Sequence, residues 1–364
     1  MRIGITGSGQ LGWMMILEGR KLGVEFNVAG ESPNDPASRI ADSFFPYTRM
    51  NDFVDSSDFV TFEFEHVPGD VIQYAMDQGK LFPSMESVVL KRDRSREKKF
   101  FTDHGIPTAK YYVSDDFTDA IEKSKAFSKS VVKQCFNGYD GKGQALVENG
   151  AVLSGSAEGK CIVEEFIDYD FEASIICYRD RHGRVGSFLP SLNFNSFGIL
   201  LYNESPVNDY GMREISEKLL SSLNYVGVMG IEFFIRNEKA MVNEFSPRVH
   251  NSGHHTLMGS SVSQFEQHVR ILSDLPTVNP VLYRPSGIVN IIGKMPTNIF
   301  DILKGKEAKP YIYGKAERRR RKIGHVNVTA ETIDDLHSLI VEIKEGIYGK
   351  TLESNLSINP HSSS

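Results

Sequence analysis

The chain has 364 residues, of which 40% are apolar and 24% charged, and its formal net charge is -6 at pH 7. These values are typical of a globular protein with two or three domains, and they give no general attraction to nucleic acid or to an anionic membrane. The three cysteines show no Cys-x-x-Cys spacing, which excludes a disulfide scaffold, and no run of about 18 apolar residues could span a membrane. We therefore expect a cytoplasmic protein without membrane or nucleic-acid partners.

A strand, a glycine-rich turn and a helix are predicted at the start of the chain. Residues 2–6 have the character of a buried strand, residues 7–12 read G-S-G-Q-L-G, a helix is predicted over 13–22, and a second strand over 24–29. Such a turn lets the backbone approach an anion, and the helix N-terminus offers free N–H groups to it. With Glu31 after the second strand, the pattern suggests an NAD-dependent oxidoreductase, although any phosphorylated ligand satisfies it equally well.

Acidic side chains end the next predicted strand. Residues 59–68 alternate between apolar and polar types, and Glu65 and His66 lie near the C-terminal end of this segment. In open α/β sheets, ligands bind outside the carboxyl ends of the strands. We therefore expect Glu65 and His66 to face whatever the turn at 7–12 holds, and a solvent-exposed sheet edge is the alternative.

The middle of the chain combines a lysine with a second glycine-rich loop. A charged helix is predicted over 90–101, and a strand over 130–133 ends on Lys133, whose ammonium group could reach a phosphate oxygen. Residues 137–144 contain three glycines and a lysine, which together could close over a triphosphate, but they do not form a Walker A sequence. Two more strands with acids, 161–167 and 171–177, could line an adenine and ribose pocket.

Two apolar runs each deliver one carboxylate to the most polar stretch of the chain. The run 225–234 contains Glu232, and the run 240–242 leads directly into Asn243 and Glu244. If these runs form neighbouring antiparallel strands, Glu232 and Glu244 lie side by side. Paired carboxylates with an amide oxygen suit a hard cation that bridges phosphates, typically Mg²⁺. A strand pair with a solvated turn is the alternative.

The loop that follows, residues 248–256, is too polar to belong to a core. Arg248 and Asn251 lie within it, together with His250, His254 and His255, which are candidate metal ligands when only this stretch is considered.

In this order, the segments resemble the ATP-grasp superfamily, and in detail the 5-(carboxyamino)imidazole ribonucleotide synthase family. The matching segments are residues 7–12, 61–68, Asp93 and Arg94 with Lys98, 138–144, 243–256, 263–270, 313–315 and 321–325. The resemblance implies a fold of mixed α/β and α+β class. It comprises an N-terminal Rossmann-like pre-ATP-grasp domain over 1–92, an ATP-grasp domain over 93–280 with a mobile lid at about 108–170, and a C-terminal α+β cap over 281–358.

The resemblance also implies a reaction. ATP phosphorylates bicarbonate to carboxyphosphate, and the amine of 5-aminoimidazole ribonucleotide takes up the carboxyl group, giving ADP and phosphate in purine biosynthesis. The implied cofactor is Mg²⁺ or Mn²⁺, without biotin, and the implied assembly is a homodimer. Order along the chain further implies that the histidines of 248–256 serve packing and the substrate loop rather than the metal.

Residue roles follow from the same resemblance. The implied metal ligands are Glu232 and Glu244. The implied ATP-binding residues are Arg94, Lys133, Gly138, Tyr139, Asp140, Gly141, Lys142, Gly143, Gln144, Glu164, Glu165, Phe166, Ile167, Glu172, Asn195, Asn243 and Glu244. The implied ribonucleotide-binding residues are Gly9, Gln10, Leu11, Glu65, Tyr139, Arg248, Asn251, Lys315, Arg321 and Lys322. The implied catalytic residues are Asp140, Lys322 and Arg248.

The sequence departs from the family pattern at several places. Ser8 replaces a glycine, Trp13 an arginine and Asn195 a histidine, and residues 318–320 replace a Pro-Gly turn with arginines. Two alternatives remain open: another ATP-grasp ligase acting on formate or an amino acid, and the NAD-dependent oxidoreductase. The oxidoreductase does not account for Lys133 or for the second glycine loop.

Overall fold

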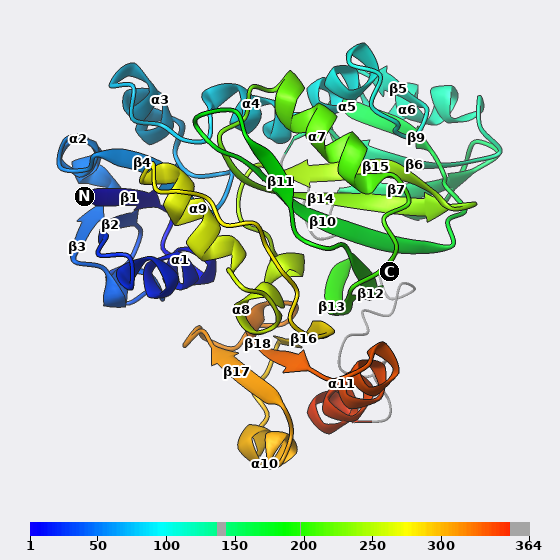
Figure 1. Ribbon diagram of the computed structural model, residues 1–364. Helices are drawn as coiled ribbons and strands as arrows, with labels where there is room; N and C mark the ends of the chain where they lie inside the picture. The colour runs from blue at the N-terminus through cyan, green and yellow to red at the C-terminus, as the bar shows by residue number, and fades with distance from the viewer. Residues whose placement is uncertain (137–142, 197, 350–364) are drawn as a thin grey trace.

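Three β-sheets with helices packed around them make up the protein (Figure 1). The computed structural model describes residues 1–136, 143–196 and 198–349. Within these ranges, no helix combines the length and apolarity that crossing a bilayer requires. The helix–sheet arrangement confirms the mixed fold class expected from the sequence.

The first sheet is parallel and has the strand order β3-β2-β1-β4. Its strands are β1 (Arg2–Thr6), β2 (Glu25–Gly30), β3 (Ser43–Pro46) and β4 (Phe59–Phe62), and the helices around it are α1 (Gln10–Arg20), α2 (Met50–Asp55) and α3 (Gly69–Asp77). The predicted strand over 59–68 is too long, because β1 ends at Thr6, the partner of Phe62, and leaves nothing for residues 63–68 to pair with. The acids of this segment therefore lie in a loop at the carboxyl edge of the sheet.

The predicted helix over 90–101 is in fact two helices, α4 (Met85–Arg92) and α5 (Arg94–Asp103). Asp93 separates them with an extended backbone, and its carboxylate accepts a hydrogen bond from the backbone N–H of Ser95 at 2.9 Å. This is an N-cap, which favours a new helix over the continuation of the old one. The break turns α5 toward the second sheet.

The second sheet is small and antiparallel, with the order β5-β9-β6-β7-β8. Its strands are β5 (Tyr111–Ser114), β6 (Lys129–Gln134), β7 (Gln144–Glu148), β8 (Ala151–Gly155) and β9 (Cys161–Glu165), and α6 (Phe117–Ser124) covers one face. It lies beside the end of the third sheet that carries β14 (Gly227–Arg236) and β15 (Lys239–Ser246) (Figure 1).

The third sheet is antiparallel and has nine strands, in the order β15-β14-β10-β12-β13-β16-β18-β17 with β11 paired to β10. The strands are β10 (Phe171–Arg179), β11 (Val185–Ser187), β12 (Ser191–Ser196), β13 (Ile199–Ser205), β14 (Gly227–Arg236), β15 (Lys239–Ser246), β16 (Ser286–Ile292), β17 (Ala308–Ile312) and β18 (Lys322–Thr329). Its helices are α7 (Met212–Ser222), α8 (Thr256–Gly259), α9 (Gln264–Leu272), α10 (Ile299–Leu303) and α11 (Ile333–Tyr348). Pairing of β13 with β16 joins the C-terminal strands to the central ones, and α1 packs on α9.

Candidate active site

The two predicted metal carboxylates lie opposite each other on neighbouring strands. Glu232 of β14 pairs in register with Glu244 of β15, next to a β-bulge, as the two apolar runs predicted. Glu244 Oε2 lies 2.6 Å from Lys91 Nζ, and Glu232 Oε1 lies 3.1 Å from His250 Nε2. Both side chains are partly exposed. The pair is therefore open to a ligand on one side and held by basic groups on the other.

Lys91 favours the charged form of Glu244. Burial raises the pKa of the Glu244 carboxyl, but the positive charges of Lys91 and Arg94 outweigh that effect and leave the pKa below its usual value. Glu97, 3.6 Å from Lys91 and almost fully buried, shows the opposite balance, since burial raises its pKa. The charged form is therefore favoured more strongly at Glu244 than at Glu97.

The donor set of this pair fits a divalent cation. Two carboxylates on adjacent strands are hard oxygen ligands, and within the described ranges no group of three His, Cys, Asp or Glu side chains is arranged to hold a metal ion. The remaining coordination positions would thus belong to water and to phosphate oxygens. Of the neighbouring histidines, His254 and His255 are buried, and His250 bonds to Glu232 and to Ser252.

A buried carboxylate joins the two predicted ATP-facing elements. Glu164 of β9 contacts Lys133 of β6 and lies 2.7 Å from Lys98 Nζ of α5. Burial raises the pKa of Glu164, but the two ammonium groups lower it to about 2 overall. Lys98 also donates to the hydroxyl of Thr108 at 2.7 Å and to the carbonyl of Asn243 at 3.0 Å. Lys98 therefore connects the small sheet to the strand that carries Glu244.

The predicted adenine and ribose residues lie near the end of β9 and the start of β10. Ile167 is buried, and Lys129 Nζ lies 4.3 Å from the ring centre of Phe166. Glu172 accepts hydrogen bonds from the Tyr169 hydroxyl at 2.6 Å and from the Asn195 amide. This contact places Asn195, the residue that replaces the family's histidine, beside Glu172 in the predicted ribose site.

The second glycine loop is only partly described. The Arg94 guanidinium donates to the Gln134 carbonyl at 3.1 Å, and the backbone N–H of Gln134 donates to the Gly143 carbonyl at 2.9 Å. Gln144 starts β7. The predictions for Gly138, Tyr139, Asp140, Gly141 and Lys142 lie outside the described residues.

The first glycine loop is occupied by a side chain that sequence reasoning missed. Both oxygens of Glu63 accept hydrogen bonds from this loop, Oε1 from the backbone N–H of Gly9 and Oε2 from that of Gly12 at 2.9 Å. Residues 7–12 thus hold an internal carboxylate. The alternation of residues 61–65 was the available signal, since it places Glu63 and Glu65 two residues apart.

The predicted ribonucleotide residues make their contacts in several parts of the chain, and Lys315 is the one seen to contact this loop. Lys315 contacts the side-chain oxygen of Gln10, Arg248 Nε lies 3.0 Å from Glu65 Oε1, and Asn251 exchanges amide hydrogen bonds of 3.1 and 2.8 Å with Asn290. Leu11 is buried, Arg321 donates to the Ala316 carbonyl at 3.3 Å, and Lys322 starts β18. His66, expected together with Glu65 to face this loop, is exposed.

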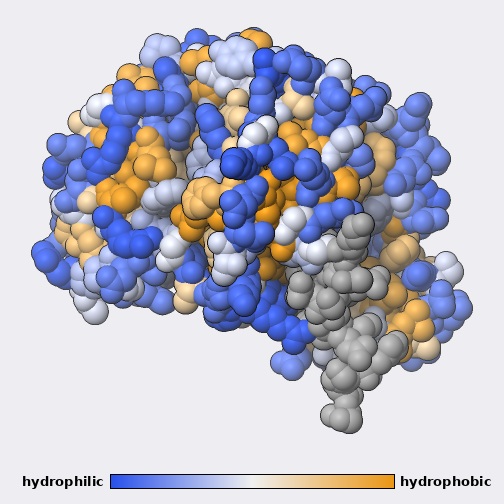
Figure 2. Space-filling view, turned by 90° about the horizontal axis from the view of Figure 1, so that it is seen from below, coloured by the Kyte–Doolittle hydropathy of each residue, from blue (hydrophilic) through white to orange (hydrophobic). Residues whose placement is uncertain are grey.

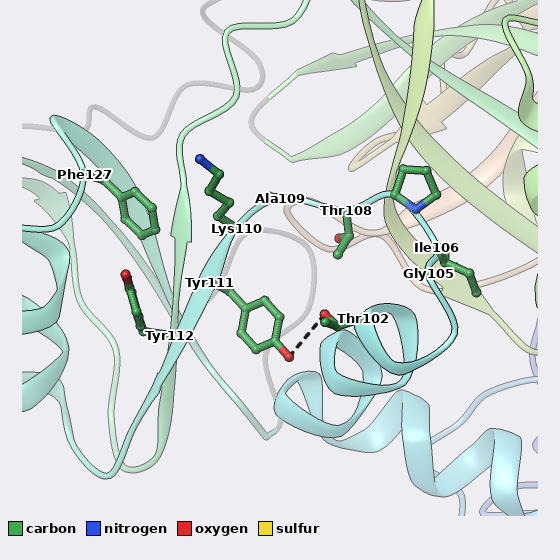
Figure 3. A pocket seen from close by; sticks show the side chains of 10 residues that line it. Thr102, Gly105, Ile106, Thr108, Ala109, Lys110, Tyr111, Tyr112 and Phe127 are labelled. Atoms are coloured by element: carbon green, nitrogen blue, oxygen red, sulfur yellow. Dashed lines mark hydrogen bonds between the residues drawn. The ribbon is translucent and has the colours of Figure 1, made fainter.

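One of the described cavities lies apart from these residues. It measures about 610 Å³ and lies between the end of α5 and β5, as Figure 3 shows. There the Tyr111 hydroxyl points at Thr102, 3.5 Å away, and Tyr112 stacks at a tilt with Phe127 on the other side of the strand. None of the predicted site residues lines this cavity. The candidate site is thus defined by its polar contacts.

Four fully buried imidazoles beneath the site predict acid lability. Burial lowers the pKa of His255 and His268 to about 4 and that of His325 to about 3, and it lowers the pKa of His254 well below its usual value. An unfolded histidine titrates near pH 6.5, so the unfolded state alone gains protons below that pH. The stability from these neutral rings is fully present above about pH 6.5 and is lost as the pH falls toward about 4.

The expected size of this effect is large. At about pH 5.5, one unit below the unfolded pKa, each group costs about 1.4 kcal/mol, so the four together cost roughly 5 to 6 kcal/mol. Urea unfolding at about pH 7 and pH 5.5 measures the difference. Equal free energies of unfolding at the two values would show that the rings are not held neutral.

The parallel sheet with its glycine loop, the small antiparallel sheet and the carboxylate pair on β14 and β15 define an ATP-grasp enzyme, and residues 99–265 match the ATP-grasp domain. The chain is 44% identical to the N5-carboxyaminoimidazole ribonucleotide synthase of Saccharolobus solfataricus, over 97% of each chain, and 40% identical to that of Aquifex aeolicus, over 92% and 94%. It belongs to the N5-carboxyaminoimidazole ribonucleotide synthase family.

The flanking domains and two solved structures support the same family. Residues 1–91 match the ribonucleotide synthetase pre-ATP-grasp domain, and residues 286–338 match the phosphoribosylaminoimidazole carboxylase C-terminal domain. The Aquifex aeolicus phosphoribosylaminoimidazole carboxylase ATPase subunit superposes with a TM-score of 0.83 at 37% identity, covering 95% of this chain and 100% of that one. The Staphylococcus aureus N5-carboxyaminoimidazole synthetase complexed with ADP gives 0.86 at 26% identity, covering 94% and 97%.

Proposed function

We propose that the protein uses ATP and bicarbonate to convert 5-aminoimidazole ribonucleotide to N5-carboxyaminoimidazole ribonucleotide, with release of ADP and phosphate, in purine biosynthesis. Family membership supports this, and one observation carries it structurally. An ATP-grasp carboxylate pair occurs in the same chain as a second site, where Lys315 from the C-terminal segment meets Gln10 of the first glycine loop. Another ATP-grasp ligase would share the carboxylate pair but would have no need of this contact.

In this proposal, Glu232 and Glu244 hold Mg²⁺ or Mn²⁺, which when bound neutralises charge on the β- and γ-phosphates. Arg94, Lys133 and Lys142 bind the phosphates. Lys133 is already held in place by Glu164, and Lys98 keeps that carboxylate charged, so the lysine needs little reorganisation to meet a phosphate oxygen. The remaining ATP contacts come from residues 138–144 and 164–167, from Glu172 and Asn195 at the ribose, and from Asn243.

The ribonucleotide is proposed to lie between the first glycine loop and residues 248–251. Gly9, Gln10 and Leu11 contact it from one side, and Arg248 and Asn251 from the other. Each of the last two is oriented by a buried partner, since Glu65 binds Arg248 and Asn290 binds Asn251. Lys315 and Arg321 hold its phosphate, because Arg and Lys are the side chains suited to such groups.

The chemistry transfers the carboxyl group directly, so that biotin has no role. A bicarbonate oxygen attacks the γ-phosphorus of ATP, and the bond to ADP breaks as carboxyphosphate forms. The amine of the ribonucleotide then bonds to the carboxyl carbon and phosphate leaves. In our proposal, Asp140 takes the amine proton, Lys322 holds bicarbonate, and Tyr139 covers the substrates, which excludes water from an intermediate that hydrolyses readily.

The same proposal covers organisation. We propose domains over 1–92, 93–280 and 281–358, with a lid at about 108–170, a cytoplasmic location, and a homodimer. The dimer would cover apolar surface such as that visible between hydrophilic side chains in Figure 2. Tyr283 and Phe300, 69% and 68% exposed, are candidates for it.

The test of this function is whether ADP release is coupled to carboxylation of the ribonucleotide. Purified protein with ATP and Mg²⁺ should release ADP rapidly only when both bicarbonate and 5-aminoimidazole ribonucleotide are present, because the intermediate is formed from one and consumed by the other. The readout is ADP formation compared with ribonucleotide consumption. Absence of ADP release with both substrates present would reject the assignment, and equal release with formate in place of bicarbonate would favour another ligase.

A further inference from the structure

The carboxylate of Glu63 occupies the position on the first glycine loop where an anionic ligand would bind in a nucleotide-binding turn. Its two oxygens accept the backbone N–H groups of Gly9 and Gly12, at the N-terminal end of the eleven-residue helix α1. Its own N–H donates to the Thr6 carbonyl at 3.1 Å, which fixes the backbone of Glu63 beside the end of β1. The side chain is half-buried. Glu63 thus binds two N–H groups of the turn from one fixed point.

The glycines of the turn fit this carboxylate. A Cβ atom on Gly9 would lie 2.5 Å from Glu63 Oε1, and one on Gly7 would lie 2.6 Å from Glu63 Cγ. Gly7 also has φ of +96°, which disfavours a side chain. Gly7 and Gly9 are therefore explained by an internal acid packed against the backbone, and no bound pyrophosphate is required.

Residues held by the turn reach the second substrate site. Gln10, the residue after Gly9, contacts Lys315 through its side-chain oxygen. The negative charge of Glu63 acts on the same lysine and raises its pKa, although burial, which is stronger, leaves the pKa of Lys315 below its usual value. Glu63 therefore fixes the backbone that carries Gln10 and provides a counter-charge near Lys315.

We propose that Glu63 is a positioning residue for the ribonucleotide. It fixes the glycine loop so that Gln10 and Leu11 meet the substrate. Because its carboxylate fills the anion position of that loop, the substrate phosphate is bound by Lys315 and Arg321 instead. This inference rests on the proposed function. It adds a role for an acid that touches no reacting atom. It also explains why a chain with a dinucleotide-type turn would not use a dinucleotide.

The test compares Glu63→Gln and Glu63→Ala with Glu86→Gln, an exposed acid on α4. Loss of a charged hydrogen-bond acceptor should raise the KM for 5-aminoimidazole ribonucleotide about tenfold to a hundredfold. The KM for ATP should stay within about twofold, because the ATP site lies on other strands. In Glu63→Ala, added acetate or formate should occupy the vacated space, bind the freed N–H groups and restore most of the ribonucleotide KM, whereas chloride at equal ionic strength should not.

Carboxylate rescue is the readout that a purely structural role would not produce. An unchanged ribonucleotide KM in both variants would overturn the inference, and so would equal increases in the KM values for ATP and ribonucleotide. If Glu63→Ala does not fold, Glu63→Gln alone decides through its ratio of KM values. Failure of the proposed function itself is distinguishable, since the wild-type protein would then show no ribonucleotide-dependent ADP release.

Discussion

Glu244→Gln should lower kcat by about a thousandfold or more, the several kcal/mol that a metal ion supplies to phosphoryl transfer. The amide keeps the size of the side chain but removes the charge that Lys91 and Arg94 stabilise beside the second carboxylate, Glu232. We expect the apparent Mg²⁺ affinity to fall as well, so that raising the metal concentration restores part of the rate. Steady-state ADP release across a Mg²⁺ titration measures both effects.

A matched control separates metal loss from unfolding. Glu214→Gln changes an exposed acid on α7 and should leave kcat and the Mg²⁺ requirement unchanged. In Glu244→Gln, Lys91 still has Glu97 at 3.6 Å, so the fold should survive with a modest loss of stability, visible as a lower Tm. Near-normal kcat of Glu244→Gln at limiting Mg²⁺ would reject a metal-binding role for this residue.

The second large effect is expected at the buried ion pair of Arg248 and Glu65. These side chains are 15% and 4% exposed, and the atoms Nε and Oε1 lie 3.0 Å apart. Arg248→Met leaves Glu65 without its main counter-charge, which costs about 3–5 kcal/mol of unfolding free energy. Because Arg248 is also a proposed ribonucleotide contact, turnover should fall with it. Urea unfolding and ribonucleotide kinetics measure the two losses separately.

A double-mutant cycle gives the control for this pair. Adding Glu65→Gln to Arg248→Met removes the unpaired charge, so the double variant should be more stable than Arg248→Met alone. Its ribonucleotide kinetics should not recover, since the arginine is still missing. If the two stability losses simply add, the ion pair is not the source of the effect.

The carboxylate pair could be predicted from sequence because its determinants are local. Two apolar runs that each carry one acid predict adjacent strands, and the observed register of Glu232 with Glu244 confirms that interpretation. The order of the lysine strand, the glycine loop and the strands with acids likewise identified the ATP-grasp fold. Local patterns of this kind predict the structure because the two-residue period of a strand fixes which side chains share a face.

Other parts depended on tertiary contacts that no local pattern contains. Lys91 and Lys98 lie in one charged segment whose periodicity shows helix but cannot show which lysine meets Glu244 or Glu164. The break at Asp93 had a sequence signal, an N-cap residue with Ser95 two positions later, and the charged run around it concealed that signal. Glu63 was missed because its partner loop lies about 50 residues away and was interpreted as a ligand site.

The continuity of the third sheet also could not be predicted from the sequence. β16 and β18 read as strands, but only the pairing of β13 with β16 places them in one sheet with the strands that carry the carboxylate pair. This continuity lets Lys315, from the segment between β17 and β18, reach Gln10 near the N-terminus. The two proposed substrate sites are thus built on a shared framework, which couples their positions.

The most direct test of the central claim follows the oxygen atoms of bicarbonate. Bicarbonate labelled with heavy oxygen, incubated with ATP, Mg²⁺ and 5-aminoimidazole ribonucleotide, should place a labelled oxygen in each phosphate released, because that oxygen bridges carbon and phosphorus in carboxyphosphate. The labelled carboxyl group should appear in N5-carboxyaminoimidazole ribonucleotide. Mass spectrometry of the phosphate and of the ribonucleotide gives both readings. Formation of the product with unlabelled phosphate would contradict the account.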